Sequence, residues 1–415
     1  MPKESIIAGL DVGTGFVRVV VGRMKQGDNR PQVIGVGEAR SFGLRRGVVV
    51  DIKDTVKSIR QAVEAATRSS GVVLTQAIVG LGGNHLQCRQ SKGVVAVSRA
   101  DGQISDDDVD RVIKAAQAIS LPPNREIVHV LPISFIVDGQ DTIKDPVGMH
   151  GVRLEVNCLV VDGSSPFIRN LVKCVNEAGL EAPHVVASPL AGAEAVLTKR
   201  QKELGVLCLD IGAGQTGLTI YEEGDIIHTN ILPVGASHIT NDIAICLRTD
   251  IDLAERIKLE YASVMPEAIN TKVKINLADL SEHERGYVPR YEIAKIVRAR
   301  AEEILDLVNQ ELKKIGRQGL LPAGVVLLGG GSKMVGMIDL VKEKLRLPAQ
   351  IGFPQETTGI LDQVDDPCFA PAIGLVYWGA KFQHEPERSD TNRFNVGVVG
   401  GVWGKFKKLI RAFNP

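Results

Sequence analysis

Two aspartates that precede glycine-rich turns carry the clearest chemistry in this sequence. Residues 206–221, VLCLDIGAGQTGLTIY, form an apolar run ending at Asp210, a turn with Gly212 and Gly214, and a second apolar run. Glycines let a backbone turn tightly and approach a ligand, and successive N–H groups in such a turn bind anions. A carboxylate at the root of the turn can hold a cation beside the anion. The pattern favours phosphate with Mg²⁺, although a hairpin that binds nothing would have the same residues.

The same plan occurs a second time near the N-terminus. Residues 6–22, IIAGLDVGTGFVRVVVG, place an apolar run before Asp11, the turn Gly13-Thr14-Gly15, and another apolar run. Such a repeat indicates two similar domains that face one another across a cleft. A second turn of the same kind suggests that both bind one polyphosphate. The alternative, a hairpin that binds nothing, is therefore less favourable.

A third glycine-rich turn follows the apolar run in residues 325–332, VVLLGGGS. A buried strand that ends in three glycines and a helix N-terminus suits the sugar and α-phosphate of a nucleotide. The alternative is a turn that only allows close packing of a strand against a helix.

Length and composition restrict the class of protein. The chain has 415 residues, enough for two or three domains, and it is rich in aliphatic residues and poor in aromatic ones, as α/β proteins are. Its six cysteines lie far apart without a C-x-x-C pair, which favours buried thiols in a reducing compartment. No apolar run approaches the roughly eighteen residues of a membrane span, and the N-terminus lacks a signal-peptide core, so we expect a cytosolic body.

Net charge is zero, with 49 basic and 49 acidic residues, but the last 14 residues hold four basic residues and no acid. The rest of the chain is therefore mildly acidic. This asymmetry predicts that the tail alone engages an anionic surface, and it gives no reason to expect nucleic acid as a partner.

Alternating strands and helices are expected to position the turns. The first domain is predicted to contain strands at 6–11, 16–22, 32–37, 72–81 and 184–187, and helices at 53–68, at 165–178, after Ser188-Pro189 and at 371–380. The second is predicted to contain strands on both sides of its phosphate turn and at 325–328, and helices at 237–247, 252–263 and 291–315.

Residues 84–162 change character and read as an insertion with its own small core. Strands are expected at 93–98, 126–137 and 152–161, in a ββαββ-like block. Its helix begins with Ser105 and Asp108 as a capping box. The acidic triplet there, Asp106, Asp107 and Asp108, could suggest a metal site, but capping explains it better.

Taken together, these motifs resemble the actin/Hsp70/sugar-kinase nucleotide-binding fold, an α/β, actin-like (ribonuclease H-like) two-domain ATPase fold. Residues 11–15 resemble its first phosphate motif, 210–216 its second and 328–332 its adenosine motif, while helices at Ser188-Pro189 and Ala370-Pro371 resemble its connecting helices. The resemblance implies bound ATP and Mg²⁺, with Asp11 and Asp210 holding the metal. It implies the following nucleotide-binding residues: Asp11, Gly13, Thr14, Gly15, Asp210, Gly212, Ala213, Gly214, Gln215, Thr216, Glu255, Lys258, Gly329, Gly330, Gly331 and Ser332.

Within that superfamily the sequence resembles the FtsA family of bacterial actin-like cell-division proteins. The inserted block at 84–162, the segment GVVVDI (47–52) and the polar linker with an amphipathic tail carry this resemblance. It implies an inserted FtsA-type small subdomain, self-association into filaments, and tethering of FtsZ to the cytoplasmic face of the inner membrane at the division site, with other division proteins as further partners.

The expected domain boundaries follow from this resemblance. The first domain comprises 1–83, 163–203 and 366–383, with the insert at 84–162. The second domain has a core at 204–235 and 316–365 and an outer subdomain at 236–315. A flexible linker (384–400) and a membrane-targeting helix (401–415) complete the chain.

One departure bears on catalysis. Many ATPases of this superfamily place Glu or Gln at the head of the first connecting helix to orient water, whereas this sequence has Ser188-Pro189, and Glu194 lies more than a turn further on. Loss of such a group costs about 10²–10⁴ in rate. We therefore expect at most a weak ATPase with no assignable catalytic residue. A small-molecule kinase of the same fold and a pilus-assembly ATPase homologue remain alternatives.

The resemblance also implies that the C-terminal peptide of FtsZ binds the outer subdomain. Basic residues early in its long helix could receive the carboxylates of that peptide: Arg290, Lys295, Arg298 and Arg300. The alternative is a solvated helix face that pairs with its own acids, Glu292, Glu302 and Glu303.

The tail is the last predicted site. Residues 384–395 are polar and nearly free of apolar groups, which is typical of a linker. The segment GVWGKFKKLIRAF then separates apolar from basic residues at helical spacing, as an interfacial helix on anionic lipid would, although a core-packing helix is the alternative. The predicted membrane-binding residues are Val402, Trp403, Lys405, Phe406, Lys407, Lys408, Leu409, Ile410, Arg411 and Phe413.

Overall fold

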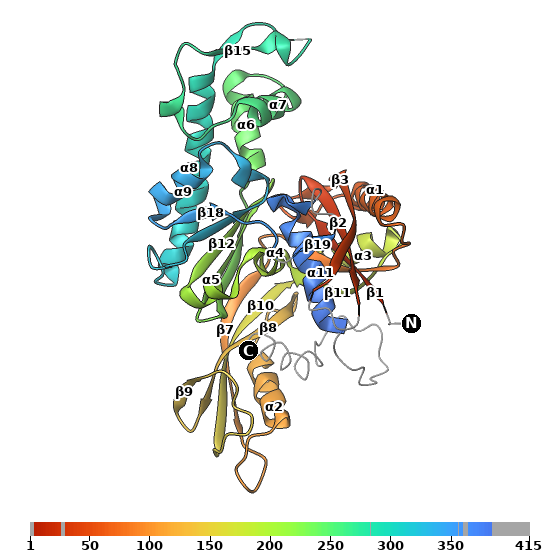
Figure 1. Ribbon diagram of the computed structural model, residues 1–415, viewed down its shortest axis with the longest axis vertical. Helices are drawn as coiled ribbons and strands as arrows, with labels where there is room; N and C mark the ends of the chain where they lie inside the picture. Colours follow the sequence, from red (N-terminus) through yellow and green to blue (C-terminus); the bar gives the residue numbers. More distant parts are fainter. Residues whose placement is uncertain (1–3, 26–29, 283, 356, 360–363, 384–415) are drawn as a thin grey trace.

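The computed structural model describes residues 4–25, 30–282, 284–355, 357–359 and 364–383. Two domains lie side by side, and a small subdomain extends from each in opposite directions (Figure 1). The predicted membrane helix and linker lie outside the described residues. Among the residues that are described, no helix is both long and apolar enough to cross a bilayer.

The first domain is built on a six-stranded sheet with the order β11-β6-β1-β2-β3-β19. Its strands are β1 (Ser5–Val12), β2 (Phe16–Met24), β3 (Gln32–Arg40), β6 (Gln76–Leu81), β11 (Glu181–Ala187) and β19 (Thr358–Gly359). β1 pairs antiparallel with β2, and β2 pairs antiparallel with β3. β6 pairs parallel with β1. The predicted strand at 72–81 begins at Gln76, because residues 71–75 form the connection that follows a helix.

Helices cover both faces of this sheet. α1 (Ile52–Ser70) packs on β3 and against α3 (Ser165–Glu177), while α11 (Ala370–Gln383) packs on β1 and against α4 (Ser188–Val196). α1 starts at Asp51, whose side chain accepts a hydrogen bond from the N–H of Asp54. The α4–α11 crossing is a backbone contact, because a Cβ on Gly374 would overlap the Ala191 carbonyl. The two predicted connecting helices therefore lie against each other.

The second domain repeats the plan of the first. Its sheet has the order β14-β13-β12-β17-β18. The strands are β12 (Val206–Ile211), β13 (Thr216–Glu222), β14 (Asp225–Leu232), β17 (Val325–Leu328) and β18 (Ala349–Ile351), with α5 (Lys199–Leu204) and α9 (Met337–Leu345) beside them. β12, β13 and β14 pair antiparallel in order, and β17 adds parallel to β12. The two domains therefore share the same pattern of strand pairing, as expected from the predicted internal repeat.

An outer subdomain caps the second domain, at the top of Figure 1. It consists of α6 (Ala236–Leu247), α7 (Ile251–Tyr261), a hairpin of β15 (Lys274–Asn276) and β16 (Tyr287–Pro289), and the long helix α8 (Arg290–Lys314). Buried aliphatic residues of α6, α7 and α8 belong to the same apolar cluster as those of β12 and β17, so this subdomain shares the core of the second domain.

The inserted subdomain, at the bottom of Figure 1, has its own sheet, β7-β10-β8-β9. Its elements are β7 (Gln87–Ala96), α2 (Asp106–Gln117), β8 (Arg125–Val137), β9 (Gln140–Ile143) and β10 (Arg153–Ser164). The predicted ββαββ order is wrong: one strand precedes the helix and three follow it, because β8 and β9 form a hairpin whose second strand is too short to give a periodic signal. The capping box of Ser105 and Asp108 is present.

The cysteines are all free, but not all are buried. Cys158, Cys174 and Cys208 are buried as expected, whereas Cys246 is exposed and Cys88 and Cys368 are half-buried. Cys246 lies near the end of α6.

A buried charge cluster joins α4, α5 and α11. Glu194 accepts hydrogen bonds from Lys202 Nζ at 2.9 Å and from Lys381 Nζ at 2.8 Å. Burial opposes ionisation of Glu194, but the two lysine charges outweigh it and hold the pKa of that carboxyl well below its usual range. Since breaking a buried ion pair leaves an uncompensated charge, this cluster fixes the three helices relative to one another.

Candidate functional site

The second phosphate turn connects β12 to β13. The Gly212 N–H donates to the Gln215 carbonyl at 3.0 Å and closes the turn. Neither Gly212 nor Gly214 has a positive φ, so their backbone angles do not require glycine. They are needed for space: a Cβ on Gly214 would lie 2.8 Å from the Thr14 side chain of the other domain.

The first phosphate turn has the same geometry and lies opposite. The Gly13 N–H donates to the Phe16 carbonyl at 3.1 Å. A Cβ on Gly15 would lie 2.9 Å from the Cβ of Ala213. The structure therefore brings the two predicted turns into van der Waals contact across the cleft.

Several backbone donors of these turns remain for a ligand. Within the described part of the chain, no acceptor is recorded for the N–H groups of Thr14, Gly15, Ala213 and Gly214. The Thr216 side chain cannot contribute, because its buried hydroxyl donates to the Val234 carbonyl at 2.8 Å. The turns thus offer four amide donors.

The two predicted metal ligands stand at the roots of these turns. Burial and then the negative charge of Asp11 raise the pKa of Asp210 to about 7, although Arg18 opposes this. Burial also raises the pKa of Asp11, against the effects of Arg18 and of Ser188, whose hydroxyl donates to Asp11 Oδ1 at 3.2 Å. Two carboxylates that repel each other in a half-buried site fit a hard divalent cation, which prefers oxygen ligands.

Arg18 is a charged member of this site that the sequence did not indicate. It projects from β2, pairs with Glu38 at 2.7 Å, and lies over the rings of Phe16 and Phe369. Side chains alternate between the two faces of the sheet along β2, and Arg18 lies opposite Asp11 in the pairing of β1 with β2. This alternation could have placed Arg18 on the same face of the sheet as Asp11. Its partner Phe369, from a segment far along the chain, could not be found that way.

The adenosine motif lies beside Asp210. Gly329 has a φ of +75°, and a Cβ there would overlap Asp210 Oδ1, so glycine is required on both grounds. Gly331 is buried against Ile211, and only Gly330 of the three glycines is exposed. The buried Ser332 hydroxyl donates to the Gly329 carbonyl at 2.7 Å and holds the loop closed on itself.

Glu255 and Lys258 form a polar cluster between α6 and α7. Lys258 Nζ donates to Glu255 Oε2 at 2.7 Å and to the Thr240 hydroxyl at 2.9 Å, and Thr240 donates to the same carboxylate at 2.5 Å. α6 itself begins on the second phosphate turn, since the Ala236 N–H donates to the Gly212 carbonyl at 2.9 Å. Lys258 Nζ also donates to the Ala236 carbonyl at 3.5 Å, so the cluster adjoins the first turn of α6, next to the glycine-rich turn.

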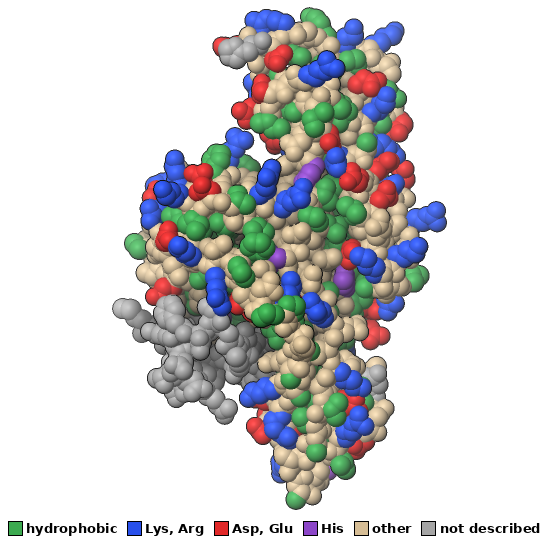
Figure 2. Space-filling view, turned by 180° about the vertical axis from the view of Figure 1, so that it is seen from behind, with side chains coloured by type: hydrophobic (Ala, Val, Ile, Leu, Met, Phe, Trp, Pro, Cys, Tyr) green, Lys and Arg blue, Asp and Glu red, His purple; other side chains and the backbone are tan. Residues whose placement is uncertain are grey.

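The basic residues predicted to receive a partner peptide are paired within the fold. Arg298 contacts Glu302 at 3.0 Å and Glu343 at 2.8 Å, and Arg300 contacts Asp242 at 2.6 Å. Arg290 donates to the Tyr261 carbonyl, and Lys295 pairs with Glu292. These contacts agree with the alternative, in which the basic residues of α8 pair with acids of the same chain. Basic and acidic side chains are likewise interspersed over the face shown in Figure 2.

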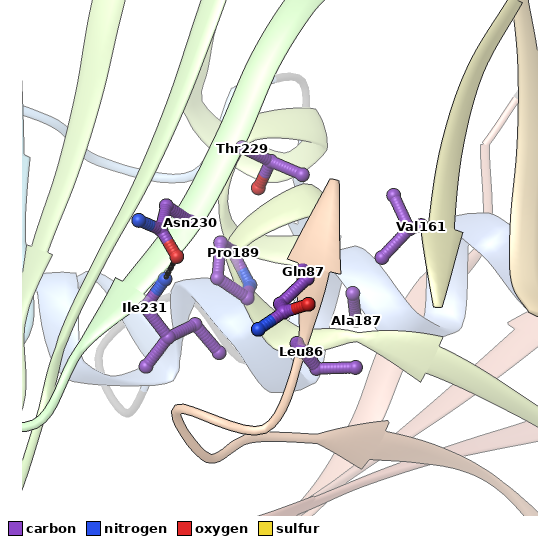
Figure 3. Close-up of a pocket in the computed structure, with 8 residues that line it drawn as sticks. All are labelled: Leu86, Gln87, Val161, Ala187, Pro189, Thr229, Asn230 and Ile231. Atoms are coloured by element: carbon purple, nitrogen blue, oxygen red, sulfur yellow. Dashed lines mark hydrogen bonds between the residues drawn. The ribbon is translucent and has the colours of Figure 1, made fainter. Parts of the chain in front are cut away.

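A small cavity lies where the inserted subdomain meets both domains, away from the phosphate turns (Figure 3). It is lined by Leu86, Gln87, Val161, Ala187, Pro189, Thr229, Asn230 and Ile231. Beside it, Cys88 Sγ lies 3.2 Å from His228 Nδ1, and His228 Nε2 lies 3.3 Å from Glu311 Oε2. Burial raises the pKa of the Cys88 thiol, with the Glu311 charge adding to the effect, so these residues act as an interdomain contact and not as an activated nucleophile.

Two similar domains that oppose phosphate turns across a cleft define the actin-like class. Solved structures with this fold include the PilM–PilN type IV pilus biogenesis complex, with a TM-score of 0.66, 18% identity, and 92% of this chain and 99% of that chain covered. MreB5 of Spiroplasma citri bound to ADP matches with a TM-score of 0.53, 14% identity, and coverage of 91% and 97%.

Sequence comparison resolves the family. The model for cell division protein FtsA matches residues 207–374, and that for the SHS2 domain inserted in FtsA matches residues 83–162. Cell division protein FtsA of Pseudomonas aeruginosa is 37% identical, with 92% of this chain and 90% of that protein covered. The Bacillus subtilis protein of the same name is 38% identical, with coverage of 92% and 85%. The chain belongs to the FtsA family of cell division proteins, which confirms the predicted family and fold.

Proposed function

We propose that this chain binds ATP with Mg²⁺ between its two domains and uses the bound nucleotide to control assembly. The observation that carries this proposal is the pair of opposed turns, each with amide donors that have no acceptor among the described residues and with an aspartate at its root. One actin-like relative in fold, MreB5 of Spiroplasma citri, is described in two structures as bound to ADP and to AMPPNP. Mg²⁺ would be held by Asp11 and Asp210, through water because this ion dehydrates reluctantly, and would neutralise phosphate charge.

Hydrolysis is expected to be slow for a structural reason. The head of α4 presents the Ser188 hydroxyl, which donates to Asp11 and so supports a metal ligand. Glu194, the nearest carboxylate along α4, is buried and ion-paired with Lys202 and Lys381, so it cannot serve as a base for water. Without a water-orienting group, the nucleotide acts mainly as a conformational ligand.

The cell-division role we propose is that of a filament-forming adaptor at the cytoplasmic face of the inner membrane. The FtsA family supports self-association and contact with division proteins. FtsZ would bind through its C-terminal peptide on the outer subdomain, and the amphipathic segment at 402–413 would anchor the filament in anionic lipid. Because many weak anchors act together, assembly and membrane attachment would reinforce each other.

Two experiments test this function. Calorimetry with ATP and Mg²⁺ should give one site per chain, and affinity should fall when EDTA removes the metal. Electron microscopy on an anionic lipid monolayer should show filaments with ATP and none without it. The proposal would be refuted if the wild-type protein bound no ATP, or if filaments formed equally with and without ATP.

A further inference from the structure

A groove lies at one end of the first-domain sheet, beside the last turns of α11. It has a volume of about 150 Å³ and is lined by residues of β1, β6, β11 and α11. β6 pairs parallel with both β1 and β11, so the beginnings of these three strands meet at one end of the sheet. α11 ends close to them, because a Cβ on Gly379 would lie 2.5 Å from the Ile7 side chain (Figure 1). The groove therefore opens where three strands begin and α11 ends.

The lining of this groove is apolar. Among the described residues that line it, only Gln76 and His184 have polar side chains. The His184 ring stacks on Phe382, with 4.2 Å between the ring centroids, so two aromatic rings belong to the lining. An apolar cavity of about 150 Å³ is large enough to hold one benzene-sized ring. The groove therefore suits a partner that inserts a single aromatic side chain.

The C-terminal part of the chain continues directly from this groove. Phe382 lines the groove, and residues 384–415 follow it in sequence. As a flexible chain, the predicted linker 384–401 would span roughly 20–25 Å on average, which allows residues 402–413 to return to the groove. Because groove and segment belong to one chain, the effective concentration of the segment is on the order of millimolar. A weak intrinsic affinity is therefore sufficient for docking.

Acidic residues stand at the rim of the groove. Glu181 begins β11 and lies opposite Gln76 in the pairing of β11 with β6. It is exposed, and no salt bridge is recorded for it in the described part of the chain. Glu4 directly precedes β1, and its carboxylate is 3.7 Å from Arg23. Residues 402–413 contain four basic residues and no acid, so the charges of rim and segment are complementary.

We propose that residues 402–413 dock in this groove of their own chain when no membrane is present. Trp403 and Phe406 are three residues apart and so share one face of a helix, which turns toward the groove and inserts one ring. The same apolar face would enter lipid, so docking and membrane attachment exclude each other. This consequence rests on the proposed anchoring by the tail, whereas the docking itself does not. The protein thereby hides its membrane anchor until anionic lipid competes for it.

Quenching of tryptophan fluorescence by acrylamide in the full chain tests the docking. The chain has two tryptophans, and because Trp378 is buried, the quencher reports mainly on Trp403. Without lipid, Trp403 should be quenched several-fold less strongly than the same residue in a synthetic peptide of residues 400–415. Gln76→Arg and Glu181→Lys should raise quenching toward the peptide value, because each places positive charge against the basic segment.

Glu64→Lys is the matched control for these variants. Glu64 is an exposed acid on α1, which packs on β3 and not on the strands of the groove. This variant makes the same charge change as Glu181→Lys and should be quenched as wild type is. The three altered positions are exposed, so melting temperatures should stay equal to that of wild type.

Co-sedimentation with anionic vesicles supplies a second readout. Gln76→Arg and Glu181→Lys should bind vesicles roughly two- to tenfold more tightly than wild type, because docking no longer competes with lipid. Glu64→Lys corrects for the gain that any added positive charge brings.

The outcomes separate docking from anchoring. If Trp403 of wild type is quenched as strongly as in the peptide, docking is overturned, and anchoring stands provided that the protein binds vesicles. Docking in this groove is also overturned if Trp403 is protected but neither rim variant exposes it. A protected Trp403 that the rim variants expose, in a protein that binds no vesicles, supports docking and overturns the proposed anchoring.

Discussion

Asp11 and Asp210 approach each other from two domains, and the charge of Asp11 adds to burial in raising the pKa of Asp210 to about 7. The fold therefore brings two carboxyl groups from separate domains close enough to affect each other's ionisation. In the proposed function, a divalent cation held by both would relieve their repulsion.

Asp210→Asn should separate binding from folding. Asparagine has nearly the same shape and removes one of the two repelling charges, so the melting temperature should stay equal or rise. Affinity for ATP with Mg²⁺ should fall at least tenfold, and EDTA should no longer weaken binding further. Calorimetry with and without EDTA checks this. A variant whose affinity still depends on Mg²⁺ as wild type does would remove Asp210 from the metal site.

Stability should fall in mild acid through His129. Burial lowers the pKa of this imidazole to about 4, and its Nε2 accepts from the Ala187 N–H at 3.0 Å. Because the folded pKa lies below the unfolded value of about 6.5, the unfolded chain takes up the proton first. The stabilisation that depends on neutral His129 is complete above about pH 6.5. As the pH falls toward 4 it is lost, and the free energy of unfolding decreases by at most about 3 kcal/mol.

His129→Gln isolates this contribution, because glutamine does not titrate. The difference in unfolding free energy between wild type and variant should narrow or change sign between pH 7 and pH 5. His150→Gln, at an exposed position, is the control. Parallel pH profiles for wild type and His129→Gln would contradict the assignment.

Among the four basic residues predicted to receive a partner peptide, Lys295 is the one best suited to do so. Its ion pair with Glu292 joins two half-exposed side chains, and such surface pairs contribute little. Arg298 and Arg300 are held by several carboxylates each. Lys295→Glu should therefore weaken binding of the FtsZ C-terminal peptide by about 1 kcal/mol, roughly fivefold, with ATP affinity unchanged.

Lys313→Glu, an exposed lysine near the other end of α8, makes the same charge change away from the expected surface. Fluorescence anisotropy of a labelled peptide compares the two. Equal losses of peptide affinity in both variants would indicate a nonspecific charge effect. Equal binding by wild type and Lys295→Glu would show that the peptide binds another surface.

The tail prediction concerns residues outside the described structure and follows from sequence alone. Trp403→Glu should reduce binding to anionic liposomes roughly tenfold or more, because one large apolar side chain is lost and a charge is added. Asn392→Glu, in the linker, adds the same charge and should bind as wild type. Co-sedimentation at two salt concentrations checks both, and undiminished binding by Trp403→Glu would show that another segment is the anchor.

Local patterns predicted the framework of this protein well. Apolar runs before Asp11 and Asp210 marked the paired turns, and the Ser105 capping box marked the start of α2, because these signals lie within a few residues of each other. The strand β9 escaped prediction since its four residues are too few for a period to appear.

The contacts that determine how the site works are long-range and left no local signal. Gln215 was predicted to bind nucleotide, but nothing in its neighbourhood indicates that its Oε1 accepts a hydrogen bond from the Gly83 N–H of the other domain, at 2.8 Å. Ser332 was predicted to bind nucleotide, which stays a prediction, and the sequence did not indicate that its hydroxyl donates to the Gly329 carbonyl of its own loop. For Arg298, partner binding and self-pairing were both open, and the sequence did not indicate Glu343, which the fold brings near and which pairs with it.

The pairing of Lys381 with Glu194 also links the end of α11 to α4, and from this link we expect a path for mechanical force. Lys381 lies in the last turn of α11, directly before the chain continues toward its C-terminal segment. Tension applied to that segment reaches α11 first and passes as shear into α4, through this ion pair and the backbone contact of Gly374 with Ala191. α4 begins at Ser188, which holds Asp11, so a pull on the C-terminus is transmitted along one rigid helix to the root of the first phosphate turn.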